Sequence, residues 1–187
     1  MNSQEQPKTT TDLDGFRFLS ESLANETLRA NAQNILDSYA HPWDILAEGL
    51  QNSVDAIEQR AEQDKHTKKT IEIVFNANER GIEIADTGIG MTCQQLKEIL
   101  APGKSLKRGV VNLRGEKGVG ISFMVFSCNI FKITTCDGKN TTSLEINGAH
   151  NWIKGAIKDE PTFSKATLLG GTKYLESSTY TKITSIP

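Results

Sequence analysis

The stretch HPWDILAEGLQNSVDAIEQRAEQ, residues 41–63, sets the interpretation of the whole chain. Pro42 stands in the first turn of a long amphipathic pattern, where its missing N–H is tolerated. Glu48, Asn52 and Asp55 occur at i, i+4 and i+7, so a helix places Asn52 and Asp55 on one face, within roughly 40° of Glu48. The sequence therefore predicts a helix over 41–63 that carries a row of three polar groups.

This row has two interpretations. An ordinary amphipathic helix would turn it to water and bury the opposite face, which consists of Trp43, Leu46, Leu50, Val54, Ile57 and Ala61. The residue types suggest a second role, because a glutamate can act as a base and an asparagine oxygen can ligate Mg²⁺. On that interpretation Asn52 holds a hydrated Mg²⁺ and Glu48 activates a water beside it. A phosphate-binding segment elsewhere in the chain would favour the second interpretation.

The stretch IEIADTGIGMT, residues 82–92, supplies another candidate group. Alternating apolar residues predict strands at 71–75 and 82–85 that form a hairpin. Asp86 falls where the second strand ends, and Gly88 and Gly90 follow it. These residue types are common in turns, so a simple turn would explain them. A carboxylate delivered by a buried strand can also accept a hydrogen bond from a ligand, such as an adenine amino group, and glycines permit close approach.

The third stretch is RGEKGVGISF, residues 114–123, where a cluster of glycines opens an apolar helix. The free N–H groups and positive dipole end of such a helix favour anions, although a turn without a ligand has the same composition. The spacing over 115–120 is G-x-x-G-x-G, which differs from the dinucleotide fingerprint. EILAPGKS, residues 98–105, ends like a phosphate loop but begins with Glu98 and follows a helix, so we reject that motif.

The composition limits the class of protein. A net charge of −2 argues against a nucleic-acid surface over the whole domain, and 37% hydrophobic residues are typical of a soluble globular chain. No apolar run approaches the roughly 18 residues of a membrane span, and the N-terminus lacks the pattern of a signal peptide. Three cysteines without a CxxC pair and three histidines without HExxH favour reduced thiols and no catalytic zinc. We therefore expect a cytoplasmic protein with no membrane partner.

The remaining patterns predict an α+β fold, a two-layer sandwich of helices on a sheet. A polar and flexible tail covers 1–15, and one domain covers 16–187. Further elements are expected as a broken helix over 16–39, a short helix around Leu96, a basic loop over 101–117, a buried helix at 121–127, and strands near 129–135, 141–147, 152–157, 172–176 and 180–184.

Taken in chain order, these three stretches resemble the motifs of the GHKL ATPase superfamily, which includes gyrase-type topoisomerases, the large heat-shock chaperones, sensor histidine kinases and MutL-type and MORC proteins. A fourth stretch, GGTK at 170–173, is similar to the late threonine motif of these domains. The resemblance implies a Bergerat fold, in which helices cover a mixed, mainly antiparallel sheet and ATP binds with Mg²⁺ beneath a lid, here 92–117.

The resemblance also implies a role for each matching residue. Glu48 is implied as the catalytic base, Asn52 as the Mg²⁺ ligand, and Asp86 as the adenine acceptor assisted by Thr172. Gly90 and Met91 would line the base pocket. The full set implied for binding the nucleotide is Asn52, Asp55, Asp86, Gly88, Gly90, Met91, Lys104, Ser105, Gly118, Val119, Gly120 and Thr172, with Lys104 and Ser105 in the lid and Gly118 to Gly120 around the phosphates.

Within the superfamily, the histidine-kinase branch fits poorly, because His41-Pro42 lacks the context of a phosphoacceptor histidine and the glutamate four residues before Asn52 favours hydrolysis. The resemblance implies Mg²⁺-dependent ATP binding and slow hydrolysis, coupled to lid closure and to homodimerisation.

Two alternatives stay open. One is a regulatory or adaptor module that senses ATP without useful hydrolysis. Members that hydrolyse ATP usually need a lysine or arginine from a second domain at the γ-phosphate, and we do not expect that domain within these residues. We accordingly expect the chain to be the N-terminal part of a longer protein. The other is a protein- or DNA-interaction platform that uses the basic segment 104–117. DNA repair, chaperone-like action and anti-phage defence are all compatible with the sequence.

Overall fold

The computed structural model describes residues 26–41, 43–100, 119–156, 161–164, 167–175 and 177–187. The helices are α2 (Glu26–Asp37), α3 (Asp44–Gln63), α4 (Cys93–Leu100), α5 (Gly120–Phe126) and α6 (Ala149–Ile153). The strands are β1 (Ile71–Asn76), β2 (Gly81–Asp86), β3 (Ile130–Asp137), β4 (Asn140–Asn147), β5 (Thr162–Phe163), β6 (Thr167–Gly170) and β7 (Thr179–Ile186). The expected tail over 1–15 and basic loop over 101–117 lie outside the described residues.

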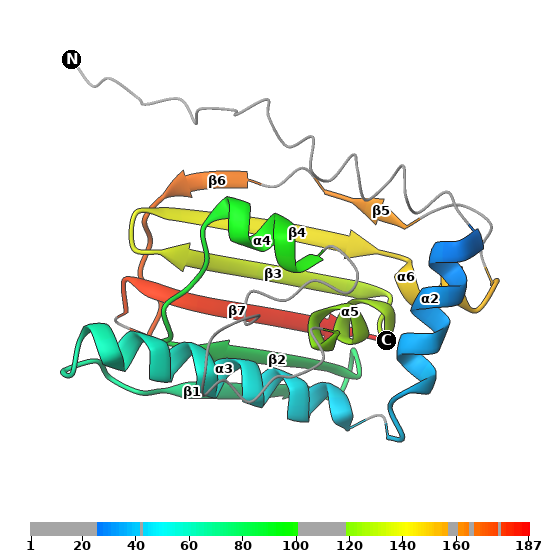
Figure 1. The fold of residues 1–187 in the computed structure, drawn as a ribbon, viewed down its shortest axis with the longest axis horizontal. Helices are drawn as coiled ribbons and strands as arrows, with labels where there is room; N and C mark the ends of the chain where they lie inside the picture. Colours follow the sequence, from blue (N-terminus) through cyan, green and yellow to red (C-terminus); the bar gives the residue numbers. More distant parts are fainter. Residues whose placement is uncertain (1–25, 42, 101–118, 157–160, 165–166, 176) are drawn as a thin grey trace, which may run out of the picture.

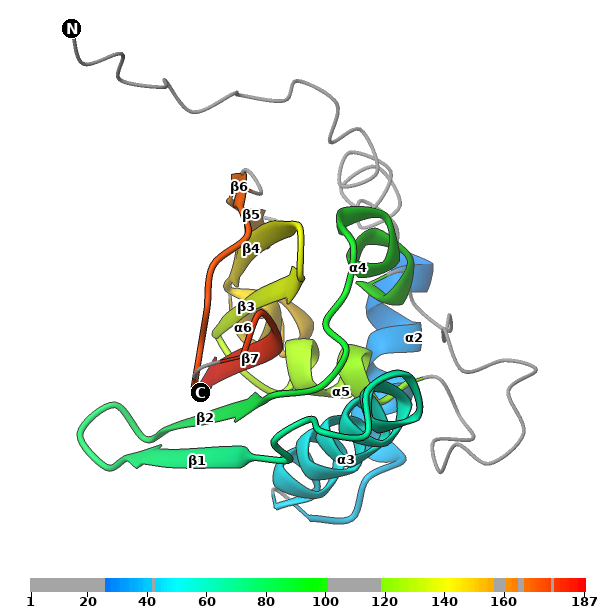
Figure 2. The same ribbon diagram turned by 90° about the vertical axis from the view of Figure 1, so that its left-hand side faces the viewer.

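The described strands form one seven-stranded sheet in the order β1-β2-β7-β3-β4-β5, with β6 also paired to β4. Every pairing among them is antiparallel. The long helices α3 and α2, together with α4 and α5, cover one face of this sheet (Figures 1 and 2). The predicted α+β two-layer sandwich is therefore confirmed. The antiparallel pairing extends to all described strands, whereas a mixed sheet was expected.

The core lies between the sheet and the helices. Phe131 and Ile133 of β3 and Leu144 of β4 point to the helical side, as the alternation of apolar residues along these strands predicts. Met124 of α5 and Leu96 of α4 complete this layer, and each is at most 1% exposed. Burying side chains of this size stabilises the fold by about 2 kcal/mol each.

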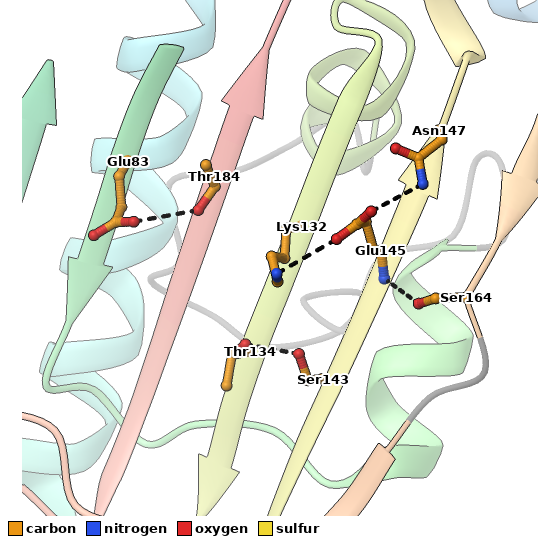
Figure 3. A network of polar contacts seen from close by, with 8 residues as sticks. All are labelled: Glu83, Lys132, Thr134, Ser143, Glu145, Asn147, Ser164 and Thr184. Atoms are coloured by element: carbon orange, nitrogen blue, oxygen red, sulfur yellow. Dashed lines mark hydrogen bonds and ion pairs between the residues drawn. The ribbon is translucent and has the colours of Figure 1, made fainter. Parts of the chain in front are cut away.

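The opposite face of the sheet is polar and is shown in Figure 3. Lys132 and Glu145 form an ion pair across β3 and β4 at 3.4 Å, and Lys182 and Glu83 pair across β7 and β2 at 2.7 Å. Partly exposed pairs of this kind contribute little to stability.

Two predicted strands are wrong. The expected strand at 152–157 is replaced by helix α6, because Trp152 and Ile153 are buried in the core cluster and Arg29 of α2 lies 4.8 Å from the centre of the Trp152 ring. The expected strand at 172–176 is an isolated bridge between Tyr174 and Ser177, and β6 is the strand that pairs with β4. Both segments are short, so their apolar residues carry no clear period.

None of the helices in the described ranges has the length and apolarity needed to cross a membrane.

Candidate active site

The polar row of α3 is turned into the molecule. Asp55 is 0% exposed, Glu48 and Asn52 are half-buried, and Trp43 from the predicted apolar face is 58% exposed. Helix α3 packs closely on β2 at Gly49, where an added Cβ would lie 2.3 Å from Cδ1 of Ile84. The interpretation of the polar row as a solvated face is therefore wrong.

Asp86, the last residue of β2, is 5% exposed and held by several donors. Its Oδ1 accepts the Gly88 N–H at 2.8 Å, and its Oδ2 accepts the Ser53 hydroxyl of α3 at 3.3 Å. The backbone N–H of Thr181 in β7 also donates to it. Burial raises the pKa of this carboxyl to about 7, although the three hydrogen bonds act in the opposite direction.

The turn after Asp86 brings its glycines against the neighbouring backbone. At Gly88, an added Cβ would lie 2.5 Å from Cβ of Ala56, and the next N–H, of Ile89, donates to the Ala56 carbonyl at 3.0 Å. Gly90 has a φ of +68°, and an added Cβ would lie 1.8 Å from the Cys136 carbonyl oxygen. Only glycine fits either position, so the turn is fixed against α3 and β3.

Met91 follows this turn and is fixed by β3. Its N–H donates to Oγ1 of Thr135 at 2.8 Å, and its side chain packs partly against the core. The fold thus places Gly88, Gly90 and Met91 in one short segment next to Asp86.

Gly120, the first residue of α5, meets Glu48, the first residue of the polar row. An added Cβ at Gly120 would lie 2.1 Å from Oε2 of Glu48, so the carboxylate packs directly on the start of α5. Val119 precedes this helix as its N-cap residue. Gly118, Lys104 and Ser105 fall outside the described residues, and their roles stay predictions.

Thr172 lies in the loop after β6. Its hydroxyl is 2.9 Å from Oγ1 of Thr141 and 2.7 Å from the hydroxyl of Tyr180. Its role beside the adenine stays a prediction, and the structure offers another threonine for it. Thr181 stands directly opposite Asp86 in the register of β2 and β7 and is 7% exposed.

Thr181 has a sequence signal of its own, the alternation of its strand. The alternation in TYTKITSI predicts that Thr181 shares the inward face of the strand with Ile183 and Ser185. The pairing partner of that strand, however, depends on contacts distant in sequence.

Comparisons with known proteins show the family to which the chain belongs. Residues 39–167 match the family model described as "Histidine kinase-, DNA gyrase B-, and HSP90-like ATPase". The chain belongs to this ATPase family. The resemblance to the GHKL superfamily is thereby confirmed, and the chain carries a domain of the ATP-binding type. A search by sequence among curated proteins finds no match.

Among solved structures, this ATPase-family chain is similar to the ATPase and transducer domains of DNA topoisomerase II from Balamuthia mandrillaris, with a TM-score of 0.56. The two share 18% sequence identity, so the likeness shows the fold alone. The match covers 78% of this chain and 37% of the topoisomerase chain.

The residues of the ATPase domain fit a metal ion that arrives with a nucleotide. Among the described residues, no group of three His, Cys, Asp or Glu side chains is placed to hold a metal by itself. Mg²⁺ usually takes only one or two protein ligands and completes its octahedron with phosphate oxygens and water. Asn52, one helical turn after Glu48 and half-buried, offers one such oxygen.

The raised pKa of Asp86 predicts a pH-dependent stability. A carboxyl whose pKa is higher in the folded protein stabilises the fold fully below its unfolded pKa, near 3.8, and this stabilisation is lost as the pH rises through about 7. Between pH 5.5 and 8.5 the loss is about 2 kcal/mol. We expect the free energy of unfolding in urea to fall by this amount relative to an Asp86→Asn variant. Parallel pH profiles of the two proteins would contradict the assignment.

Proposed function

We propose that the chain binds ATP together with Mg²⁺ at the site formed by α3, the end of β2 and the start of α5, and that it hydrolyses ATP slowly. One observation carries this proposal: two segments distant in sequence, 86–90 and the start of α5, meet on α3. Ser53 of α3 hydrogen-bonds Asp86, Ala56 receives the glycine turn, and Glu48 packs on Gly120.

The adenine end of the site would be the Asp86 side. Its carboxylate can accept a hydrogen bond from the 6-amino group of adenine, with Thr181 as its neighbour in the sheet and Thr172 as the residue implied by the resemblance. Gly88 and Gly90 hold the turn against α3 and β3 beside this carboxylate, and Met91 would offer an apolar surface to the base.

The phosphate end would be the Glu48 side. Val119 and Gly120 begin α5 there, and Gly118, Lys104 and Ser105 are implied as their neighbours by the resemblance. Asn52 would ligate Mg²⁺, which supplies positive charge to the phosphate oxygens. Asp55, 0% exposed in the middle of α3, would support this row from within the helix.

Glu48 is the residue that we assign as general base. It would orient a water for in-line attack on the γ-phosphorus and take its proton as the bond to the bridging oxygen breaks, so that ADP and phosphate leave. Closure of the lid over 92–117 and ATP-dependent homodimerisation belong to the same proposal. The alternative is a nucleotide-sensing regulatory or adaptor module that binds ATP without useful hydrolysis.

Turnover measured together with binding separates the two candidates. We expect the 187-residue chain to release phosphate slowly from ATP in Mg²⁺, to lose this activity in EDTA, and to form a dimer in sedimentation runs with a non-hydrolysable ATP analogue. Tight binding of the analogue without phosphate release at saturating ATP would favour the sensor. Absence of binding would contradict both.

A further inference from the structure

Tyr39 lies between α2 and α3, and its side chain reaches the carboxylate assigned as the base. The phenol hydroxyl donates to Oε1 of Glu48 at 2.9 Å, although the two residues are nine positions apart. The Tyr39 side chain is half-buried, so this hydrogen bond is partly shielded from competing water. A hydrogen bond to a charged acceptor is stronger than one between neutral groups.

The ring of Tyr39 is itself held in place. It stacks on Phe123 of α5, with 3.6 Å between the ring centroids and 13° between the ring planes. Phe123 is 4% exposed, and the α5 residues around it form part of the core. The packing of the ring on α5 therefore fixes the position of the phenol hydroxyl.

The two oxygens of Glu48 face different elements. Oε1 accepts the Tyr39 hydroxyl, whereas Oε2 packs on Gly120 at the start of α5. Phe123, which holds the Tyr39 ring, lies one turn further along the same helix. Helix α5 thus fixes the carboxylate from both sides, directly at Gly120 and indirectly through Phe123 and Tyr39.

Tyr39 also remains a donor over the working range of pH. Burial, the hydrogen bond to Glu48 and the nearby carboxylate charges raise its pKa well above the ordinary value, so the hydroxyl keeps its proton.

We propose that Tyr39 is a positioning residue for Glu48. Its hydroxyl orients the Glu48 carboxylate so that the remaining lone pairs point toward the attacking water. This inference rests on the proposed role of Glu48 as the base. The role of Tyr39 requires no contact with ATP. Tyr39 therefore raises the rate of the chemical step and leaves the affinity for the nucleotide unchanged.

Tyr39→Phe tests the inference, because it keeps the stacked ring and removes only the hydroxyl. We expect kcat for ATP to fall roughly 10- to 100-fold, while KM and the Kd of a non-hydrolysable analogue change less than about twofold. Tyr174→Phe is the matched control. It removes a similar hydrogen bond, from Tyr174 to Oε2 of Glu72 at 2.6 Å, outside the proposed site, and should leave kcat unchanged.

A double-mutant cycle shows whether Tyr39 acts through Glu48. In a Glu48→Ala background, Tyr39→Phe should have no further effect on single-turnover hydrolysis. An unchanged kcat in Tyr39→Phe, or an equal loss in both backgrounds, would overturn the inference while leaving the proposed function intact. If Glu48→Ala keeps full turnover, the assignment of the base fails instead, and the role of Tyr39 fails with it.

Discussion

Asp86→Asn is expected to reduce the affinity for ATP by about 100-fold or more, which would place binding below detection in an ordinary titration. An asparagine retains a single acceptor oxygen, while Gly88, Ser53 and Thr181 all donate to the native carboxylate. The substituted amide would then present N–H groups to donors of the protein or of the adenine. Losing a hydrogen bond to a charged acceptor and leaving a donor unpaired costs about 3 kcal/mol, which corresponds to this change in Kd.

Glu83→Gln is the control for this variant. Glu83 lies on the same strand but on the opposite face, where it pairs with Lys182. We expect it to bind the ATP analogue like the wild type. Both variants should retain the circular dichroism of the wild type at pH 6. Binding by Asp86→Asn within threefold of the wild type would remove Asp86 from the site.

Glu48→Ala is expected to separate binding from turnover. Removing a general base typically lowers the rate by about 100- to 10,000-fold, while a side chain that contacts only the attacking water adds little to the affinity for ATP. We therefore expect the Kd of a non-hydrolysable analogue to stay within about threefold, while phosphate release in single-turnover assays slows by about 100- to 10,000-fold.

The control variant for Glu48 lies on the same helix. Glu58 is exposed on α3, so Glu58→Ala should keep wild-type turnover and binding. If Glu48→Ala loses binding together with turnover, the role of Glu48 is structural, because its carboxylate also joins Tyr39 to the start of α5. Full turnover in Glu48→Ala would place the base elsewhere.

The parts of the fold that were predictable from the sequence are those with local signals. The hairpin of β1 and β2 follows from strict alternation, and Asp86 at the strand end follows from the glycines after it. Helix α3 follows from its length and period. The burial of the polar row on α3 was not predictable from the same period, because hydrophobicity alone assigns Trp43 to the core.

The other misses concern contacts between distant segments. Thr181 is the neighbour of Asp86 only through the register of β2 and β7, which no local pattern encodes. Tyr39 reaches Glu48 because α2 and α5 pack together, and its own sequence neighbourhood contains no motif. Functional sites often break local rules in this way, since polar groups are buried there for their chemistry.

A calorimetric titration of the chain with non-hydrolysable ATP and GTP analogues in Mg²⁺ tests the central claim most directly. At pH 8, above the pKa of about 7 for Asp86, its carboxylate is ionised, so it can accept hydrogen bonds but cannot donate one. Adenine presents an amino group at position 6, whereas guanine presents an oxygen there. We predict that one ATP analogue binds per chain and that the GTP analogue binds at least about 100-fold more weakly. The reason is that a buried acceptor placed for the amino group of adenine would face the carbonyl oxygen of guanine without a hydrogen bond. Equal binding of both nucleotides, or binding of neither, would contradict an adenine site at Asp86.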